Sequence, residues 1–186
     1  MRHGFKAQSE RTAASARIAL GLKPNAPLGP WEYAKHLNVT VLDFGILSLS
    51  KQATAQLTIH DGDSWSAMTL QVTDKFTIVL NPCHAITRQR SDLMHELAHI
   101  ELRHSPARVE VSESGLLLLS DYSDEQEQEA DWLGAALLLP REGLVRLRAT
   151  RKSAAEIAAY YGVSEALCQW RLRTTGVETQ MRRSHR

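Results

Sequence analysis

Residues 92–104 read DLMHELAHIELRH, and the spacing within this stretch decides how the rest of the chain is interpreted. His95 and His99 are four positions apart, so on a helix they lie on one face and can turn their imidazole rings toward one point. This spacing suits two nitrogen ligands of a single tetrahedral zinc ion. Glu96 follows the first histidine and can reach a water molecule on the metal without binding the metal itself. The stretch therefore predicts a helix with a catalytic metal site, unless the two histidines share this spacing by chance.

A third ligand is needed, because a catalytic zinc site has three protein ligands and one open position. The two cysteines, Cys83 and Cys168, do not have the spacing of a closed structural site. The histidine-only pattern HExxHxxGxxH is also absent, because Leu102 and Ser105 stand where that pattern has glycine and histidine. The third ligand is therefore expected to be a carboxylate further along the chain.

The stretch DEQEQEADWLGAALLLP at residues 124–140 supplies such carboxylates. On a helix, Glu127 and Asp131 lie on the same face as Ala130 and Gly134, which are small enough to let this helix approach the histidine helix closely. We therefore predict Glu127 as the third ligand. Asp131 is predicted to be the acceptor that orients a ligand histidine through its other ring nitrogen.

Two other acids of this stretch, Glu125 and Glu129, project to the opposite side of the helix and are expected in solvent. An alternative explanation for all these acids is the helix dipole, which favours negative charge in the first turn of a helix. The dipole does not explain why the small residues share a face with Glu127.

The composition is that of one globular core, because 43% of the 186 residues are hydrophobic and 23% are charged. The longest apolar runs, at residues 116–119 and 133–140, are far shorter than the roughly 20 residues that cross a bilayer. Residues 1–20 are interrupted by charges and lack the apolar core of a secretion signal. Two isolated cysteines fit a reducing compartment. We therefore expect a cytoplasmic protein without a membrane segment.

Hydrophobic spacing predicts an α+β protein with N-terminal helices, a small twisted β-sheet, the histidine helix and a helical C-terminal half. We predict a core of residues 1–140 and a helical region of residues 141–186, packed on the core and ending in a flexible basic tail. The predicted helices cover residues 7–20, 85–104 and 123–139. Another helix is predicted to begin at Pro30, and three short helices are predicted after residue 140. The predicted strands cover residues 39–44, 55–60, 66–72 and 75–81, and residues 105–122 are predicted to form an irregular loop.

The chain contains HELAH at residues 95–99, EQEAD at residues 127–131 and LLLP at residues 137–140. In this order the three motifs resemble the pattern of the ImmA/IrrE metallopeptidases, zincins whose third metal ligand is a glutamate. The resemblance extends over nearly the whole chain.

The resemblance implies a zincin-like core in which His95, His99 and Glu127 hold zinc and Glu96 is the catalytic base. The family often has asparagine where Asp131 stands in this chain. That departure affects the orienting partner of a ligand rather than the ligands themselves.

The resemblance also implies a zinc-dependent endopeptidase that cleaves a helix-turn-helix transcriptional repressor, in a regulatory, stress-response, mobile-element or toxin–antitoxin-like setting. Related peptidases bind an extended substrate at a sheet edge, so residues 66–72 or 75–81 are expected to receive it by strand addition. Tyr122 and His104 are the candidates for stabilising the oxyanion, because each lies near a ligand in the sequence and can donate a hydrogen bond.

The C-terminal region is basic: residues 141–186 contain 10 Lys and Arg against 4 Asp and Glu, whereas residues 1–140 contain 12 against 17. Within it, residues 154–176 are typical of a helix, a Gly-Val-Ser turn and a second helix, in which Arg171 and Arg173 can contact phosphate. A DNA-binding transcriptional regulator is therefore the alternative function. A metal-binding module without catalysis is a further alternative.

Overall fold

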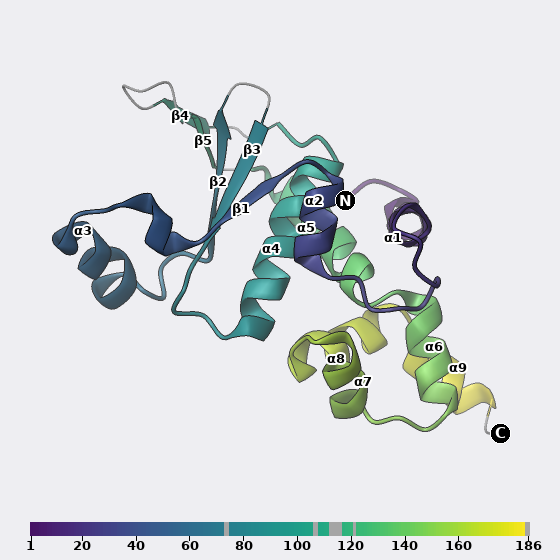
Figure 1. Cartoon of the computed structure of the whole chain (residues 1–186). Coiled ribbons are helices and arrows are strands. Elements are labelled where there is room, and N and C mark those ends of the chain that lie inside the picture. The colour runs from purple at the N-terminus through teal and green to yellow at the C-terminus, as the bar shows by residue number, and fades with distance from the viewer. Residues whose placement is uncertain (73–74, 106–107, 112–116, 121, 185–186) are drawn as a thin grey trace.

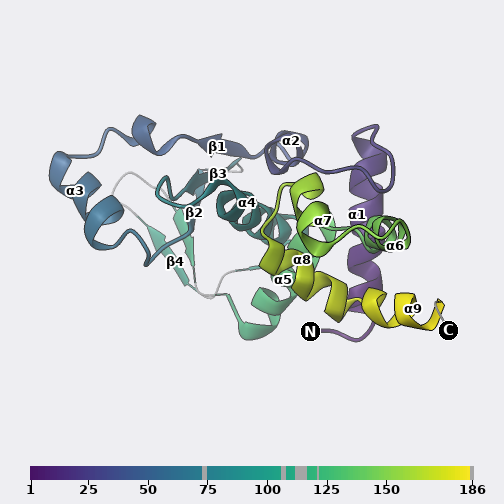
Figure 2. The ribbon, with the colours of Figure 1, turned by 90° about the horizontal axis from the view of Figure 1, so that it is seen from below.

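The computed structural model describes residues 1–72, 75–105, 108–111, 117–120 and 122–184. Within these residues the protein is a mixed α+β structure, as predicted, in which helices pack in layers beside a five-stranded sheet (Figure 1). The helix α4 (Ile86–Glu101) packs on the strands β2 (Ala67–Val72) and β3 (Lys75–Leu80) of the sheet. The helix α5 (Asp124–Leu138) packs on α4, and α1 (Phe5–Ala19) packs on α5 in turn (Figure 2).

The sheet has the strand order β1-β3-β2-β5-β4, with β1 parallel to β3 and the other neighbours antiparallel. Its strands are β1 (Thr40–Leu42), β2 (Ala67–Val72), β3 (Lys75–Leu80), β4 (Arg108–Val111) and β5 (Leu117–Ser120). Both β2 and β3 are interior strands of the sheet, and β2 pairs with β5 over Thr69–Gln71. The predicted addition of a substrate strand is therefore wrong for the residues that have neighbours on both sides, and it stays a prediction for residues 66–68. Among the described strands the two edge strands are β1 and β4.

Residues 55–60 are helical, although the sequence predicts a strand. They continue α3 (Lys51–Ala55) into one wider helical turn at Gln56–His60. The Ser50 side chain caps α3 by accepting a hydrogen bond from the Ala53 amide. This local cap outweighs the alternation of β-branched residues that favours a strand. The segment projects away from the sheet (Figure 1).

The remaining predicted helices are present, whereas the predicted loop and tail contain regular structure. The loop at 105–122 contains β4 and β5, and residues 106–107, 112–116 and 121 of it lie outside the described residues. The predicted tail, residues 180–186, begins inside α9 (Val177–Ser184), which packs against α6 (Arg141–Ala149) and α8 (Glu165–Thr174). Residues 185–186 lie outside the described residues. The other helices of the described residues include α2 (Pro30–His36), α6 (Arg141–Ala149), α7 (Ala154–Tyr161), α8 (Glu165–Thr174) and α9 (Val177–Ser184). In the described part of the chain, no helix combines the length and the apolar character needed to cross a membrane.

The C-terminal helices share the hydrophobic core of α4 and α5. Their buried side chains include Leu144, Ile157, Leu172 and Val177. Arg171 is fully buried, where its Nε donates to the Leu139 carbonyl at 3.2 Å and its Nη2 pairs with Glu10 of α1. The predicted phosphate contact by Arg171 is therefore wrong, because this guanidinium satisfies a carbonyl at the end of α5. Arg173 is exposed. The predicted division of the chain into a core of residues 1–140 and a helical region of residues 141–186 stays a prediction.

Candidate metal centre

The helix α4 carries the HELAH sequence in its C-terminal half. Packing fixes the rotation of this helix, because one side of it is fully buried. The buried residues next to the motif are Leu93, Met94, Leu97 and Ala98. With that side in the core, His95 and His99 turn toward α5, and Glu96 turns toward β2.

The helix α5 lies close enough to α4 to share a site with it. It begins with a capping box in which the Ser123 and Gln126 side chains each accept a hydrogen bond from the other residue's amide. Further along, a Cβ on Gly134 would stand only 3.3–3.5 Å from backbone atoms of α4. The predicted close approach of the two helices is therefore confirmed, and it brings Glu127 to the histidines.

Ligand atoms of His95, His99 and Glu127 come together within 4.8 Å of one another. The two histidine Nε2 atoms are 3.0 Å apart. Glu127 places Oε2 at 3.1 Å from His95 Nε2 and Oε1 at 3.8 Å from His99 Nε2. The structure thus gathers the three residues that the sequence predicts as ligands.

These separations fit a single zinc ion. With bonds of about 2.0–2.1 Å, the corners of a tetrahedron lie about 3.3–3.4 Å apart, which is close to the three distances. Two imidazoles and a carboxylate suit zinc, although they also hold other divalent metals. The His99 side chain is 2% exposed, whereas those of His95 and Glu127 are 25% and 44% exposed. The group is therefore open on one side, where a cleft of about 340 Å³ adjoins His95 and Glu96.

Glu96 stands outside the ligand group. Its Oε2 accepts a hydrogen bond of 2.5 Å from Thr69 Oγ1 of β2. Burial raises the pKa of Glu96, although the Thr69 hydrogen bond opposes this shift. A carboxylate with a raised pKa is suited to accept a proton and return it near neutral pH. The sequence gives no signal for Thr69, because only the packing of α4 on the sheet brings the two residues together.

His95 is oriented from behind by Asp131. Its Nδ1 lies 3.0 Å from Asp131 Oδ1, while its Nε2 faces the ligand group. This is the arrangement that the predicted role of Asp131 requires. Burial disfavours the charged form of His95, but hydrogen bonds to Asp131 and Glu127 outweigh it and raise the pKa of His95 to about 10. Without metal, His95 is therefore the protonated member of the group.

A family model described as the IrrE N-terminal-like domain of the M78 peptidases matches residues 44–173, and this range includes both helices of the site. The chain belongs to the ImmA/IrrE family. Members of this peptidase family are metallopeptidases, and the mixed α+β structure is consistent with a zincin-like domain. A search of curated proteins finds no match to the chain.

Tyr122 of this ImmA/IrrE chain lies directly beside the ligands. Its ring stacks on the His99 ring with the centroids 3.8 Å apart and the planes 30° from parallel. Burial and the negative charges of Glu96 and Glu127 raise the pKa of Tyr122 to about 12. The hydroxyl therefore stays protonated at neutral pH and can donate a hydrogen bond, as its predicted catalytic role requires.

His104 lies on the side of His99 that faces away from Glu127, where it lines a second cleft of about 210 Å³ together with His99 and Tyr122. Its Nδ1 is 3.1 Å from His99 Nδ1, which is the ring nitrogen that faces away from Glu127. The His104 side chain is 6% exposed. This position does not support the predicted role of His104 in stabilising an oxyanion, and it makes His104 a neighbour of a ligand instead.

Glu129 is buried, so the prediction that it is solvated is wrong. Its side chain is 3% exposed and pairs with Arg2 at 2.8 Å, whereas Glu125 is 58% exposed, as expected. Packing of α1 on α5 covers a second face of that helix. The run WLGAALLL at residues 132–139 is apolar all round, which indicates a helix buried on several sides. That signal could have identified the burial of Glu129 from the sequence.

Proposed function

We propose that this chain is a zinc-dependent endopeptidase in which His95, His99 and Glu127 hold the metal and Glu96 is the catalytic base. One observation carries the proposal: three ligand atoms from α4 and α5 converge within 4.8 Å, beside a carboxylate that is not part of the group. Two histidines and one carboxylate leave a position open, as catalytic rather than structural zinc sites do.

When bound, zinc supplies Lewis-acid polarisation of the scissile carbonyl and makes water acidic enough to lose a proton near pH 7. Glu96 accepts the proton that the attacking water loses and passes it to the departing amine. The hydrogen bond from Thr69 holds the Glu96 carboxylate in place for both transfers. The protonated hydroxyl of Tyr122 donates to the carbonyl oxygen as negative charge develops on it, and Asp131 keeps the ring of His95 oriented.

Replacing Glu96 by glutamine tests this assignment. The amide keeps the shape of the side chain but cannot accept the proton, so cleavage is expected to fall by about 10²–10⁴-fold while zinc content stays unchanged. Glu125→Gln makes the same chemical change on the exposed side of α5 and serves as the control. Full cleavage by Glu96→Gln would exclude Glu96 as the catalytic base. A wild-type chain that binds zinc but cleaves nothing would favour a metal-binding module without catalysis.

We also propose that the substrate is a helix-turn-helix transcriptional repressor, met in the cytoplasm in a regulatory, stress-response, mobile-element or toxin–antitoxin-like setting. This assignment is supported by the family resemblance. Labelling of new protein N-termini in cells that produce either the wild-type chain or Glu96→Gln tests it. A new N-terminus inside a repressor, seen with the wild type alone, is the expected result. New N-termini found only in other classes of protein would contradict the assignment.

Direct DNA contact through residues 141–186 has less support than proteolysis. Arg171 and Cys168 of α8 are fully buried, and Leu172 is nearly so, which leaves little of this helix to meet base edges. Arg173 remains exposed for phosphate contact. Titration with duplex DNA at several salt concentrations measures the affinity of the chain for DNA. The absence of binding at low salt would exclude direct DNA binding.

A further inference from the structure

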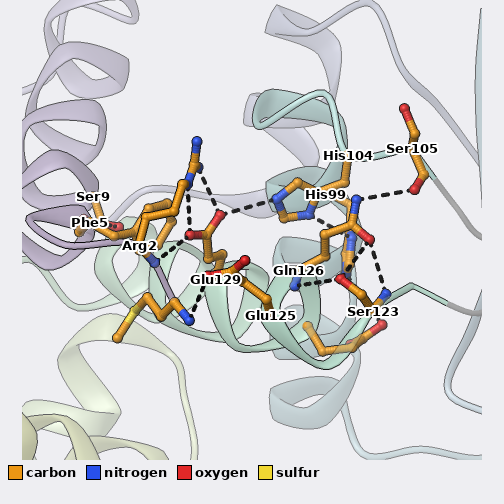
Figure 3. A network of polar contacts seen from close by, with 12 residues as sticks. Arg2, Phe5, Ser9, His99, His104, Ser105, Ser123, Glu125, Gln126 and Glu129 are labelled. Atoms are coloured by element: carbon orange, nitrogen blue, oxygen red, sulfur yellow. Dashed lines mark hydrogen bonds and ion pairs between the residues drawn. The ribbon is translucent and has the colours of Figure 1, made fainter.

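A line of polar groups runs from His99 through His104 and Glu129 and ends at Arg2 (Figure 3). His104 Nδ1 lies 3.1 Å from His99 Nδ1, and His104 Nε2 lies 3.6 Å from Glu129 Oε2. Arg2 holds Glu129 with two guanidinium hydrogen bonds of 2.8 Å, and its backbone amide adds a third of 3.1 Å. The side chains of His99, His104 and Glu129 are each 6% exposed or less, whereas that of Arg2, at the end of the line, is 58% exposed.

The direction of these contacts follows from the role of His99. A histidine that offers Nε2 to a metal carries its proton on Nδ1. That proton is donated to His104 Nδ1, so the neutral His104 ring keeps its own proton on Nε2, facing the Glu129 carboxylate. Within the described residues, His104 Nε2 has no hydrogen-bond partner within 3.5 Å. The Glu129 carboxylate at 3.6 Å favours this tautomer through its negative charge, because it faces the nitrogen that carries the proton.

The turn after α4 is built to keep His104 next to His99. Arg103 adopts a left-handed backbone conformation with φ 53°, and the His104 amide donates to the His99 carbonyl at 3.0 Å. This hydrogen bond closes the helix in the manner of a Schellman motif. From α5, the Gln126 side chain donates to the Ser105 carbonyl at 3.1 Å and holds the turn in place (Figure 3).

Arg2 reaches Glu129 from the segment that precedes α1. Phe5 is 1% exposed and anchors this segment, and its amide donates to the Arg2 carbonyl at 3.2 Å. A buried carboxylate is stable only where its charge is paired and its oxygens are hydrogen-bonded. Arg2 provides three hydrogen bonds and the opposite charge for Glu129.

We propose that Arg2 is a positioning residue of the metal centre, which acts through Glu129 and His104 to hold His99 in the orientation and tautomer that bind metal. The inference rests on the proposed zinc site and adds to it a segment from the N-terminal end of the sequence. Loss of the partners that surround a ligand histidine typically weakens metal binding 10–100-fold. The same range is expected here when this line of contacts is broken.

Zinc affinity of the full chain, measured by competition with a chromogenic chelator, tests the proposal without a substrate. Arg2→Ala is expected to weaken zinc binding about 10-fold. Arg2→Lys should recover part of this loss, because an ammonium pairs with Glu129 but cannot make the two parallel hydrogen bonds. Arg11→Ala removes an exposed arginine of α1 and is the matched control. Unchanged affinity in Arg2→Ala would overturn the proposal.

A double-mutant cycle separates a contact relayed by His104 from a general effect on folding. If Arg2 acts through His104, Arg2→Ala weakens zinc binding about 10-fold in the wild-type background and hardly at all in the His104→Ala background. Equal losses in the two backgrounds would mean that Arg2 only stabilises the fold, and they would refute the relay. Glu129→Gln keeps the shape of the buried side chain and should show the same non-additivity with Arg2→Ala.

These zinc-affinity measurements do not depend on cleavage of a substrate, so they test the role of Arg2 separately from the endopeptidase activity. A chain that binds zinc, loses affinity as described and cleaves no protein refutes the endopeptidase while the role of Arg2 stands. A chain that cleaves but shows no loss of affinity in Arg2→Ala refutes the role of Arg2 alone. A wild-type chain that binds no zinc refutes both.

Discussion

The packing of Gly134 against α4 sets how far Glu127 stands from the two histidines, and enlarging this residue tests that link. A Cβ at position 134 would lie 3.3 Å from the Met94 carbonyl oxygen and 3.4 Å from the His95 amide nitrogen. Both atoms belong to the α4 backbone and cannot swing aside. Alanine requires a shift of a few tenths of an ångström, and its helix propensity, about 1 kcal/mol better than that of glycine, offsets the strain. Gly134→Ala is therefore expected to change stability little.

Valine adds two methyl groups to the same Cβ, so α5 must move away from α4. We expect Gly134→Val to lower the free energy of unfolding by about 1–3 kcal/mol, the usual effect of overpacking. Glu127 moves with the helix. Its distance to His99 Nε2 is already 3.8 Å, against the roughly 3.3 Å between corners of a zinc tetrahedron. An outward shift lengthens this distance, and zinc affinity is expected to fall by about 10-fold or more.

Denaturant unfolding of the metal-free chain and a zinc competition titration measure the two effects. Gln128→Val, on the exposed side of α5, controls for the lower helix propensity of valine and should leave zinc affinity unchanged. Zinc binding by Gly134→Val as tight as that of the wild type would refute the claim that this contact sets the ligand distances.

Three further predictions concern the groups around the ligands. Thr69→Val removes a hydrogen bond that lowers the pKa of Glu96, so the acid limb of the pH–rate profile should move to higher pH; an unmoved limb would separate Thr69 from catalysis. Because the pKa of His95 is raised to about 10 in the folded metal-free chain, its contribution to stability is complete below the unfolded value of 6.5 and is lost as the pH rises through about 10. Thermal unfolding across this range should show the loss, and Asp131→Asn should flatten it; a flat wild-type profile would contradict the shift. Glu127→Ala should reduce zinc from about one per chain to much less by elemental analysis, and full retention would remove Glu127 from the ligand set.

The sequence by itself determined which residues of the two site helices share a face. The four-residue spacing of the histidines and the placement of Glu127, Ala130 and Gly134 depend only on the helical repeat, which is a local property of the chain. For that reason the predicted ligand group could be named before the structure and is found together in it. The predicted strand at residues 55–60 failed because alternation is a weaker signal than the cap at Ser50, which is equally local.

Tertiary structure alone decided the surroundings of that group. Glu129 meets Arg2 across 127 positions of sequence, and Glu96 meets Thr69 across 27. No periodic pattern encodes such pairs, because they depend on how α1 and the sheet pack against the two site helices. The interior places of β2 and β3 likewise depend on pairing with β1 and β5. Local spacing therefore determined the predicted ligand group, and contacts between distant segments determined which residues surround it.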